Sequence, residues 1–197
     1  MEKNDFTGYI LAGGGSSRMG RDKYALELGG QTFLERAAGV LRGACGDVKV
    51  VLNQTQMIET DFPVVRDIFA GRGAPGAIHA ALQDCATKYA LVLAVDLPLV
   101  TAEAVARLAE TALEANKFPA CVVRQTDGRP QPLFAVYRVR YCLPALENLL
   151  NENPTASVRD FFDLAYPKFV EQRLLSDDED LLLNVNTPED LARATRK

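Results

Sequence analysis

The sequence predicts an α/β fold of three layers, in which a mostly parallel sheet lies between two layers of helices. Two observations support this prediction. Short apolar runs rich in β-branched residues alternate along the chain with segments of helical periodicity. The length of 197 residues suits one domain, residues 1–197, with a single substantial core.

Six strands are expected, each of them a short apolar run: residues 8–11, 48–52, 64–66, 89–95, 120–124 and 133–137. The run 89–95 is nearly all apolar, which is typical of a central strand. Six helices are expected from helical periodicity: residues 32–42, 75–86, 101–116, 139–150, 157–164 and 187–194. Thr187 as N-cap and Pro188 at the first helical position mark the last helix clearly. Between the elements, residues 127–132 are expected to form a turn and the acidic residues 176–180 a solvated loop.

Composition excludes several classes of function. The chain has 22 Lys and Arg against 26 Asp and Glu, a net charge of −4, so no overall positive field holds nucleic acid or an anionic membrane. His79 is the only histidine, so the sequence offers little support for a His-based zinc site or a Ser-His-Asp triad. His79 is expected to be a packed or partly exposed helix residue.

The cysteines and the apolar segments indicate a soluble cytoplasmic protein. Four widely spaced cysteines form no C-x-x-C pair and are expected to be reduced core thiols: Cys45, Cys85, Cys121 and Cys142. The first residues are polar and charged, unlike a signal peptide, and the longest apolar run is too short to span a bilayer.

A glycine-rich loop, LAGGGSSRMGRDK at residues 11–23, follows the first predicted strand. Three consecutive glycines allow main-chain N–H groups to approach an anion closely, and Arg18, Arg21 and Lys23 add charged donors suited to phosphate. Gly15 and Gly20 have the Walker A spacing, but that motif fails because Arg21 and Asp22 stand where Lys and Ser or Thr are needed. The dinucleotide fingerprint lacks its third glycine. The loop therefore predicts a phosphate site of another kind.

Polar residues follow three further strands: Asn53, Asp67 and Asp96. Because ligands of open α/β sheets bind beyond the carboxyl ends of the strands, these residues are expected to share one edge with the loop. Asp96 can hold Mg²⁺, which prefers one or two protein oxygens beside phosphates and waters, and Thr101 is better placed than Asp96 to cap the next helix. Asn53 and Asp67 suit a purine or ribose, although both residue types also form turns. The loop at residues 71–77 is either a second anion-friendly element or a plain connection.

Together these residues resemble the molybdenum cofactor guanylyltransferases, a family of nucleotidyltransferases with a Rossmann-like fold akin to nucleotide-diphospho-sugar transferases. The resemblance covers nearly the whole chain. It rests on the motifs LAGG, RMG and DK near the start, on Asn53, Asp67 and DLP at 96–98, and on RPQPLFAVY at 129–137 and NVNTPEDL at 184–191. The chain departs from the family at residues 73–78, where proline comes one place later and Ala77 replaces glycine, and at Thr101, where a second proline is common.

The resemblance implies a nucleotidyltransferase that moves GMP from GTP to molybdenum-molybdopterin. It implies that Leu11, Ala12 and Gly13 line the nucleotide, that Lys23 contacts its phosphates, that Asn53 and Asp67 complete the guanosine site, and that Asp96 binds nucleotide and Mg²⁺. Arg18, Lys23 and Asp96 are then the expected catalytic residues. The resemblance implies that Asn184 and Asn186 face the active-site cleft, without a firm role. Molybdenum-insertion proteins and apo-molybdoenzymes are the implied protein partners.

Two alternatives stay open at this point. One is a different nucleotidyltransferase of the same fold, either molybdopterin cytidylyltransferase or an enzyme acting on a sugar or alcohol phosphate. The other is a non-catalytic nucleotide-binding protein, because a fold can lose or exchange its site.

Overall fold

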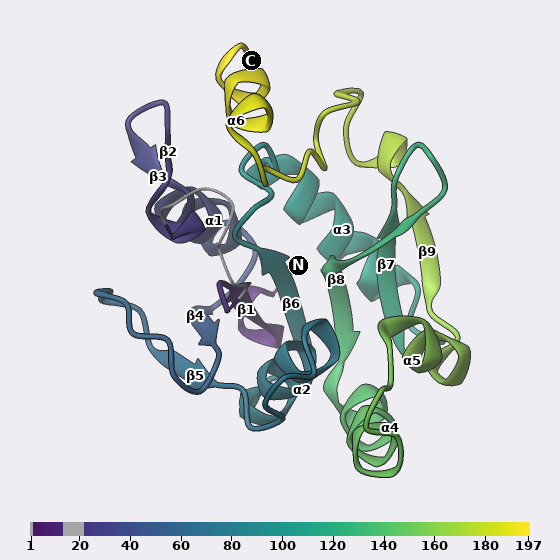
Figure 1. Cartoon of the computed structure of the whole chain (residues 1–197). Coiled ribbons are helices and arrows are strands. Elements are labelled where there is room, and N and C mark those ends of the chain that lie inside the picture. The colour runs from purple at the N-terminus through teal and green to yellow at the C-terminus, as the bar shows by residue number, and fades with distance from the viewer. Residues whose placement is uncertain (1, 14–21) are drawn as a thin grey trace.

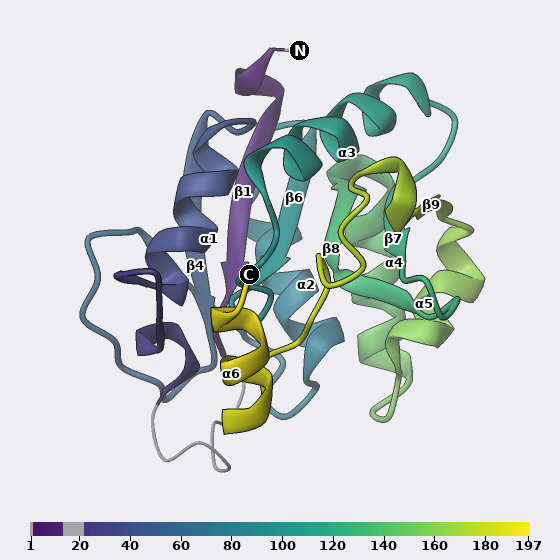
Figure 2. The ribbon, with the colours of Figure 1, turned by 90° about the horizontal axis from the view of Figure 1, so that it is seen from above.

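A seven-stranded sheet runs through the centre of the molecule (Figure 1). The computed structural model describes residues 2–13 and 22–197. The strands follow the order β5-β4-β1-β6-β8-β7-β9. Their bounds are β1 (Phe6–Leu11), β4 (Asp47–Leu52), β5 (Val64–Arg66), β6 (Tyr89–Ala94), β7 (Ala120–Arg124), β8 (Pro130–Arg138) and β9 (Lys168–Glu171). Strands β5, β4, β1 and β6 are parallel neighbours, and β8 runs antiparallel to both β6 and β7, so the sheet is mostly parallel as predicted. Figure 2 shows β1, β4 and β6 side by side.

Helices cover both faces of this sheet and complete the predicted three layers (Figure 1). On one face lie α1 (Phe33–Arg42) and α3 (Ala102–Glu114), and on the other lie α2 (Ala74–Asp84), α4 (Val139–Glu152) and α5 (Val158–Ala165). Side chains alternate between two buried cores: Phe6 and Ile10 of β1 join the α1 face, whereas Tyr9 and Leu11 join the α2 face. The alternation follows from the two-residue period of a strand.

Side-chain caps fix where several helices begin. Thr32, Ser157 and Thr187 each form a capping box, and Thr101 accepts a hydrogen bond from the backbone of Ala104. Each cap satisfies a backbone N–H that the first helical turn leaves without a partner. The predicted start of α6 (Pro188–Thr195) is therefore confirmed, and so is the role of Thr101 as a cap.

Three details differ from the predictions. Strand β8 already begins at Pro130, so the turn is shorter than expected. The strand β9 and a small hairpin of β2 (Glu27–Leu28) and β3 (Gln31–Thr32) were not predicted. In the acidic segment 176–180, Asp180 is buried and forms ion pairs with Arg193 and Lys197, so this carboxylate anchors α6 and is not simply solvated.

The remaining helical turns are short 3₁₀ segments at Lys3–Asp5, Lys23–Ala25 and Gln172–Leu174. All four cysteines are buried and free, as expected. Burial raises the pKa of Cys45 and of Cys142 to about 12, which keeps both thiols protonated and poorly reactive. Within the described residues, no helix has the length and apolar character needed to cross a membrane.

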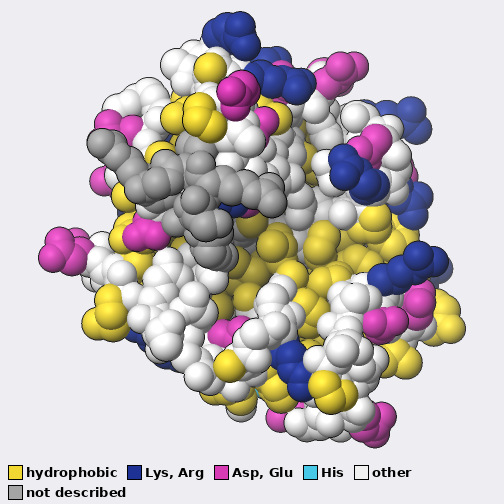
Figure 3. All heavy atoms as spheres, viewed as in Figure 1, with side chains coloured by type: hydrophobic (Ala, Val, Ile, Leu, Met, Phe, Trp, Pro, Cys, Tyr) yellow, Lys and Arg dark blue, Asp and Glu magenta, His cyan; other side chains and the backbone are white. Residues whose placement is uncertain are grey.

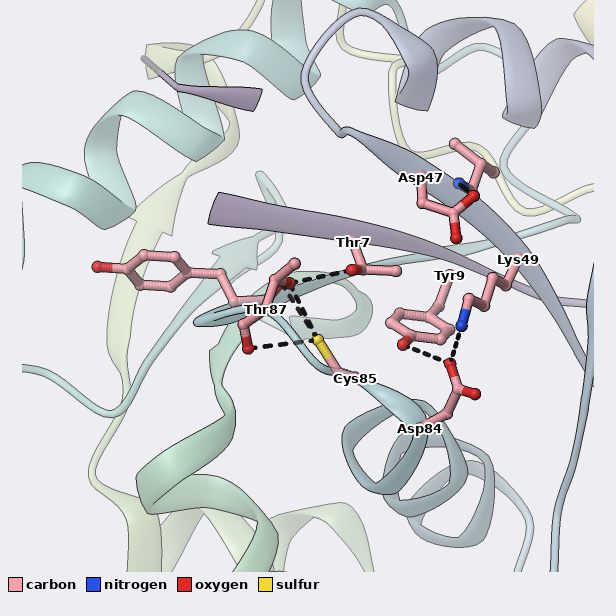
Figure 4. Close-up of polar contacts among 9 residues, drawn as sticks. Thr7, Tyr9, Asp47, Lys49, Asp84, Cys85 and Thr87 are labelled. Atoms are coloured by element: carbon pink, nitrogen blue, oxygen red, sulfur yellow. Dashed lines mark hydrogen bonds and ion pairs between the residues drawn. The ribbon is translucent and has the colours of Figure 1, made fainter. Parts of the chain in front are cut away.

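A polar cluster lies where α2 ends (Figure 4). Oδ2 of Asp84 accepts hydrogen bonds from the hydroxyl of Tyr9 and from Nζ of Lys49, each 2.8 Å long. Asp84 stands at the negative end of the helix dipole, where a carboxylate is disfavoured, and Lys49 and Tyr9 offset that cost. Helix α2 thus connects this cluster, at its carboxyl end, to the pocket described next, at its amino end.

Candidate active site

A pocket of about 570 Å³ opens at the carboxyl ends of β1, β4, β5 and β6. Its lining includes every predicted nucleotide-binding residue: Leu11, Ala12, Gly13, Lys23, Asn53, Asp67 and Asp96. Figure 3 shows a hollow with hydrophobic side chains at its floor on this face of the molecule. The predicted gathering of polar strand ends is confirmed, whereas Arg18 lies outside the described residues.

The end of β1 is held between its two neighbours. The backbone N–H of Ala12 donates to the carbonyl of Val51 at 3.0 Å, and the carbonyl of Leu11 accepts from the N–H of Val95 at 3.1 Å. A Cβ added to Gly13 would lie 2.9 Å from the backbone nitrogen of Asn53. Position 13 therefore needs glycine so that the chains following β1 and β4 can approach each other.

Asn53 bridges these two chains with its side chain. Its Oδ1 accepts hydrogen bonds from the backbone N–H groups of Thr55 and Gln56, at 3.1 and 2.8 Å, while its Nδ2 donates to the carbonyl of Gly13 at 3.2 Å. The turn-forming role and the site role considered for Asn53 thus coexist, because the residue shapes the turn and also lines the pocket.

Asp67 is buried, with 7% of its surface exposed, where β5 meets the start of α2. Its Oδ1 accepts a hydrogen bond from the backbone N–H of Phe69 at 2.8 Å. Burial raises the pKa of this carboxyl group, and the bond from Phe69 and the nearby ring of His79 act in the opposite direction. Asp67 is therefore a fixed acceptor in the wall of the pocket.

Lys23 and Asp96 form an ion pair of 2.8 Å, although they lie far apart in the chain. Nζ of Lys23 also donates to Oδ1 of Asn186. Asn186 is held in turn, because its backbone N–H donates to Asp190, and the preceding residue, Val185, donates to the carbonyl of Asp96. The structure thus brings Asn186 beside two of the predicted catalytic residues.

The carboxylate of Asp96 fits a divalent cation shared with a nucleotide. It stands at the end of a buried strand, about one-fifth of its side-chain surface is exposed, and only Oδ2 is hydrogen-bonded within the described residues. No cluster of three metal-ligating side chains occurs among these residues. One protein carboxylate with phosphate and water ligands matches the preference of Mg²⁺.

The loop before α2 supplies backbone and small side chains to the pocket through Gly71, Gly73 and Ala74. Its basic residue, Arg72, instead donates to the carbonyls of Asn153 and Leu150 at the end of α4, at 3.1 and 3.4 Å. The cation of this loop therefore ties two elements together. Glycines before a helix had indicated this loop, whereas no sequence pattern indicated that Gln54 and Thr55 line the pocket.

A second, more polar pocket of about 470 Å³ adjoins the first through Asn186, which lies beside Lys23. Its lining also includes Asn184, Gln125, Asp127 and Arg129. The turn before β8 thus lies in the same wall of this pocket as Asn184 and Asn186.

Residues 8–168 match the family described as the MobA-like NTP transferase domain. The chain belongs to this family. The prediction of a nucleotidyltransferase related to the molybdenum cofactor guanylyltransferases is thereby confirmed.

Two curated relatives align over almost their whole length. A probable molybdenum cofactor guanylyltransferase of Pelotomaculum thermopropionicum is 37% identical, over 95% of this chain and 91% of its own. A molybdenum cofactor guanylyltransferase of Rhizobium johnstonii is 32% identical, over 100% of this chain and 94% of its own.

Solved structures share the fold. Molybdopterin-guanine dinucleotide biosynthesis protein A of Archaeoglobus fulgidus superposes with a TM-score of 0.80 at 23% identity, covering 96% of this chain and 97% of its own. The 2-C-methyl-D-erythritol 4-phosphate cytidylyltransferase of Thermus thermophilus superposes with a TM-score of 0.69 at 20% identity, covering 95% and 96%. The predicted nucleotidyltransferase fold is confirmed, and this likeness by itself does not choose the base.

Proposed function

We propose that this protein transfers GMP from GTP to the phosphate of molybdenum-molybdopterin, forming the guanine dinucleotide cofactor and releasing pyrophosphate. The observation that carries the proposal is the assembly of Leu11–Gly13, Lys23, Asn53, Asp67 and Asp96 around one pocket. The names of the full-length relatives favour guanylyl transfer over the cytidylyl and sugar-phosphate alternatives.

The reaction needs no general base. A phosphate oxygen of the pterin attacks the α-phosphorus of GTP, a new P–O bond forms, and the bond to the pyrophosphate leaving group breaks. Because the nucleophile is already an anion, catalysis depends on positioning and on stabilising negative charge. A site that offers a lysine, a carboxylate and amide groups suits these needs.

Lys23 is placed to stabilise the phosphates. Its ammonium lies between Asp96 and Asn186, which hold the flexible side chain in one position before the nucleotide arrives. Binding a nucleotide with its metal would exchange the contact between Lys23 and Asp96 for contacts to phosphate and cation. Arg18 remains a candidate for the same task from its place in the glycine-rich loop.

Asp96 would hold Mg²⁺, and the bound ion would neutralise charge on the triphosphate and polarise it for attack. Asn53 and Asp67 would border the guanosine, with Asp67 as an acceptor for ring or ribose donors. Leu11, Ala12 and Gly13 would present main-chain groups along the nucleotide.

A single assay tests the proposal. Pyrophosphate release is measured with GTP, CTP and ATP, each with molybdenum-molybdopterin and Mg²⁺, and with the acceptor omitted as a control. We expect acceptor-dependent release with GTP. Pyrophosphate release with CTP alone would exclude guanylyl transfer. No release with any nucleotide would exclude nucleotidyltransferase activity altogether.

A further inference from the structure

We propose that Arg66 is a positioning residue for the nucleotide, a role it performs from outside the pocket by fixing the turn at residues 53–56. The inference rests on the proposed function, since it concerns the wall that would face the nucleoside. Arg66 does not line the pocket, and it belongs to none of the motifs that indicated the site.

Arg66 is the last residue of β5 and pairs with Leu52, the last residue of β4. This register places the guanidinium group against the backbone of the residues that follow β4. Its Nη1 donates to the carbonyl of Asn53 at 2.9 Å and also to the carbonyl of Gln56. One cation therefore binds both ends of the turn.

The same turn is held from its inner side by the Asn53 side chain, which accepts from the N–H groups of Thr55 and Gln56. Arg66 takes up the carbonyls of the turn, and Asn53 takes up its N–H groups. Because these backbone groups are hydrogen-bonded in the observed conformation and would lose those bonds in another, the turn is stabilised as it stands.

A reciprocal bond joins the turn to the next wall of the pocket. Nε2 of Gln54 donates to the carbonyl of Ile68 at 3.2 Å, next to Asp67. Arg66 and Gln54 thus connect the chains after β4 and β5 in both directions. Asn53 also donates to the carbonyl of Gly13 at 3.2 Å, so a shift of the turn would disturb this contact as well.

The position of Asn53 consequently depends on Arg66. Hydrogen bonds to a charged group are stronger than those between neutral groups, and a lost donor leaves two carbonyls to be satisfied by water. Without the guanidinium group, the turn would sample open conformations, and the nucleotide would have to restore the closed one on binding. This cost weakens binding and leaves the bond-making step at Lys23 and Asp96 intact.

The test compares Arg66→Met, which keeps the aliphatic stem, with Arg66→Lys, which keeps the positive charge and can still donate to a carbonyl. Arg107→Met is the matched control, because Arg107 is an exposed arginine of α3 paired with Glu103. Amide hydrogen exchange at Thr55 and Gln56 is measured without nucleotide, and GTP binding is measured by calorimetry beside kcat and KM.

For Arg66→Met we expect faster exchange at both amides and a rise of roughly tenfold in the dissociation constant and KM for GTP, with kcat at saturation within about twofold of wild type. Arg66→Lys should recover part of the affinity, and Arg107→Met should match wild type. Unchanged exchange in Arg66→Met would overturn the proposed restraint on the turn. Faster exchange with unchanged GTP affinity, or a fall in kcat alone, would overturn the positioning role.

The two proposals fail in different ways. If the wild-type protein bound GTP without releasing pyrophosphate, the proposed transferase function would fail, while exchange and calorimetry would still decide the role of Arg66. Thermal unfolding of each variant separates a local effect from general loss of the fold, because a general loss would also raise exchange in the strands β1 and β6.

Discussion

Asp67 and Gly76 are packed so closely that a Cβ at position 76 would lie 2.7 Å from Oδ2 and 2.9 Å from Oδ1 of the carboxylate. Gly76 lies in the first turn of α2, and Pro75 stands beside it at a position that tolerates proline. The departure from the family pattern at residues 73–78 therefore keeps a glycine at the point where the carboxylate approaches the helix.

Gly76→Ala should weaken GTP binding about tenfold and lower the melting temperature, because the new methyl group must displace the Asp67 carboxylate. Helix propensity alone predicts the opposite, since alanine favours a helix by about 1 kcal/mol over glycine. Calorimetry with GTP and thermal unfolding measure the two effects. Gly39→Ala is the control, because Gly39 is exposed in α1 and a Cβ there meets nothing within 4 Å. Equal behaviour of the two variants would contradict the steric account.

Asp96→Asn should lower kcat/KM with GTP by at least about a hundredfold, because the amide removes the charge that would hold Mg²⁺. Lys23→Met should lower kcat/KM by a similar factor, because it removes the ammonium group that would stabilise the phosphates. Pyrophosphate release at several Mg²⁺ concentrations measures both losses, and circular dichroism checks that the fold persists. Near-normal turnover of Asp96→Asn would remove this carboxylate from the mechanism.

The sequence predicted most of the sheet because the buried strands are short apolar runs, and it predicted the site because polar residues end those strands. Strand β9, with the sequence KFVE, escaped prediction because two of its four residues are charged and it owes its place to pairing with β7. The hairpin of β2 and β3 did carry a signal, the pair Gly29-Gly30, whose positive φ angles suit a tight turn.

The pattern of residues along the sequence could not predict contacts between segments that are distant in the chain. Nothing in the spacing of Lys23 and Asn186 indicates that their side chains meet, because α6 and the chain before it are placed by tertiary contacts. Arg66 escaped notice for a related reason. A single arginine at a strand end is ordinary in sequence, and its importance arises from the register of β5 against β4.

The pH dependence of stability should contain a contribution from His79. This histidine is fully buried in α2, neither ring nitrogen has a hydrogen-bond partner within the described residues, and Glu147 lies 3.8 Å away. Burial lowers the pKa of His79 below its ordinary value of 6.5, against the opposing effects of Glu147 and Asp67. The unfolded chain therefore binds the proton more readily than the folded protein. The contribution of His79 to the free energy of unfolding is therefore fully present above pH 6.5, and it is lost as the pH falls through the lower pKa of the folded state.

Urea unfolding of wild type and of His79→Leu at pH 5.5 and pH 8 tests this expectation. Leucine cannot bind a proton, so the variant should lose less stability than wild type between pH 8 and pH 5.5. The substitution itself should cost little at pH 8, because it removes a buried polar ring that has no hydrogen bond. Equal pH dependence in both proteins would show that His79 does not titrate in this range.

The polar cluster at the far end of α2 should affect stability and leave catalysis unchanged. Tyr9→Phe removes a hydrogen bond to a charged acceptor, which is worth about 1.5 to 3 kcal/mol, while Lys49 still neutralises Asp84. Because the loss leaves a carboxylate that is still paired and partly exposed, we expect the lower end of this range. Urea unfolding measures the loss, and kcat and KM for GTP should equal those of wild type, because the cluster and the pocket lie at opposite ends of the helix. A change in KM for GTP without loss of stability would contradict this separation of the cluster from the pocket.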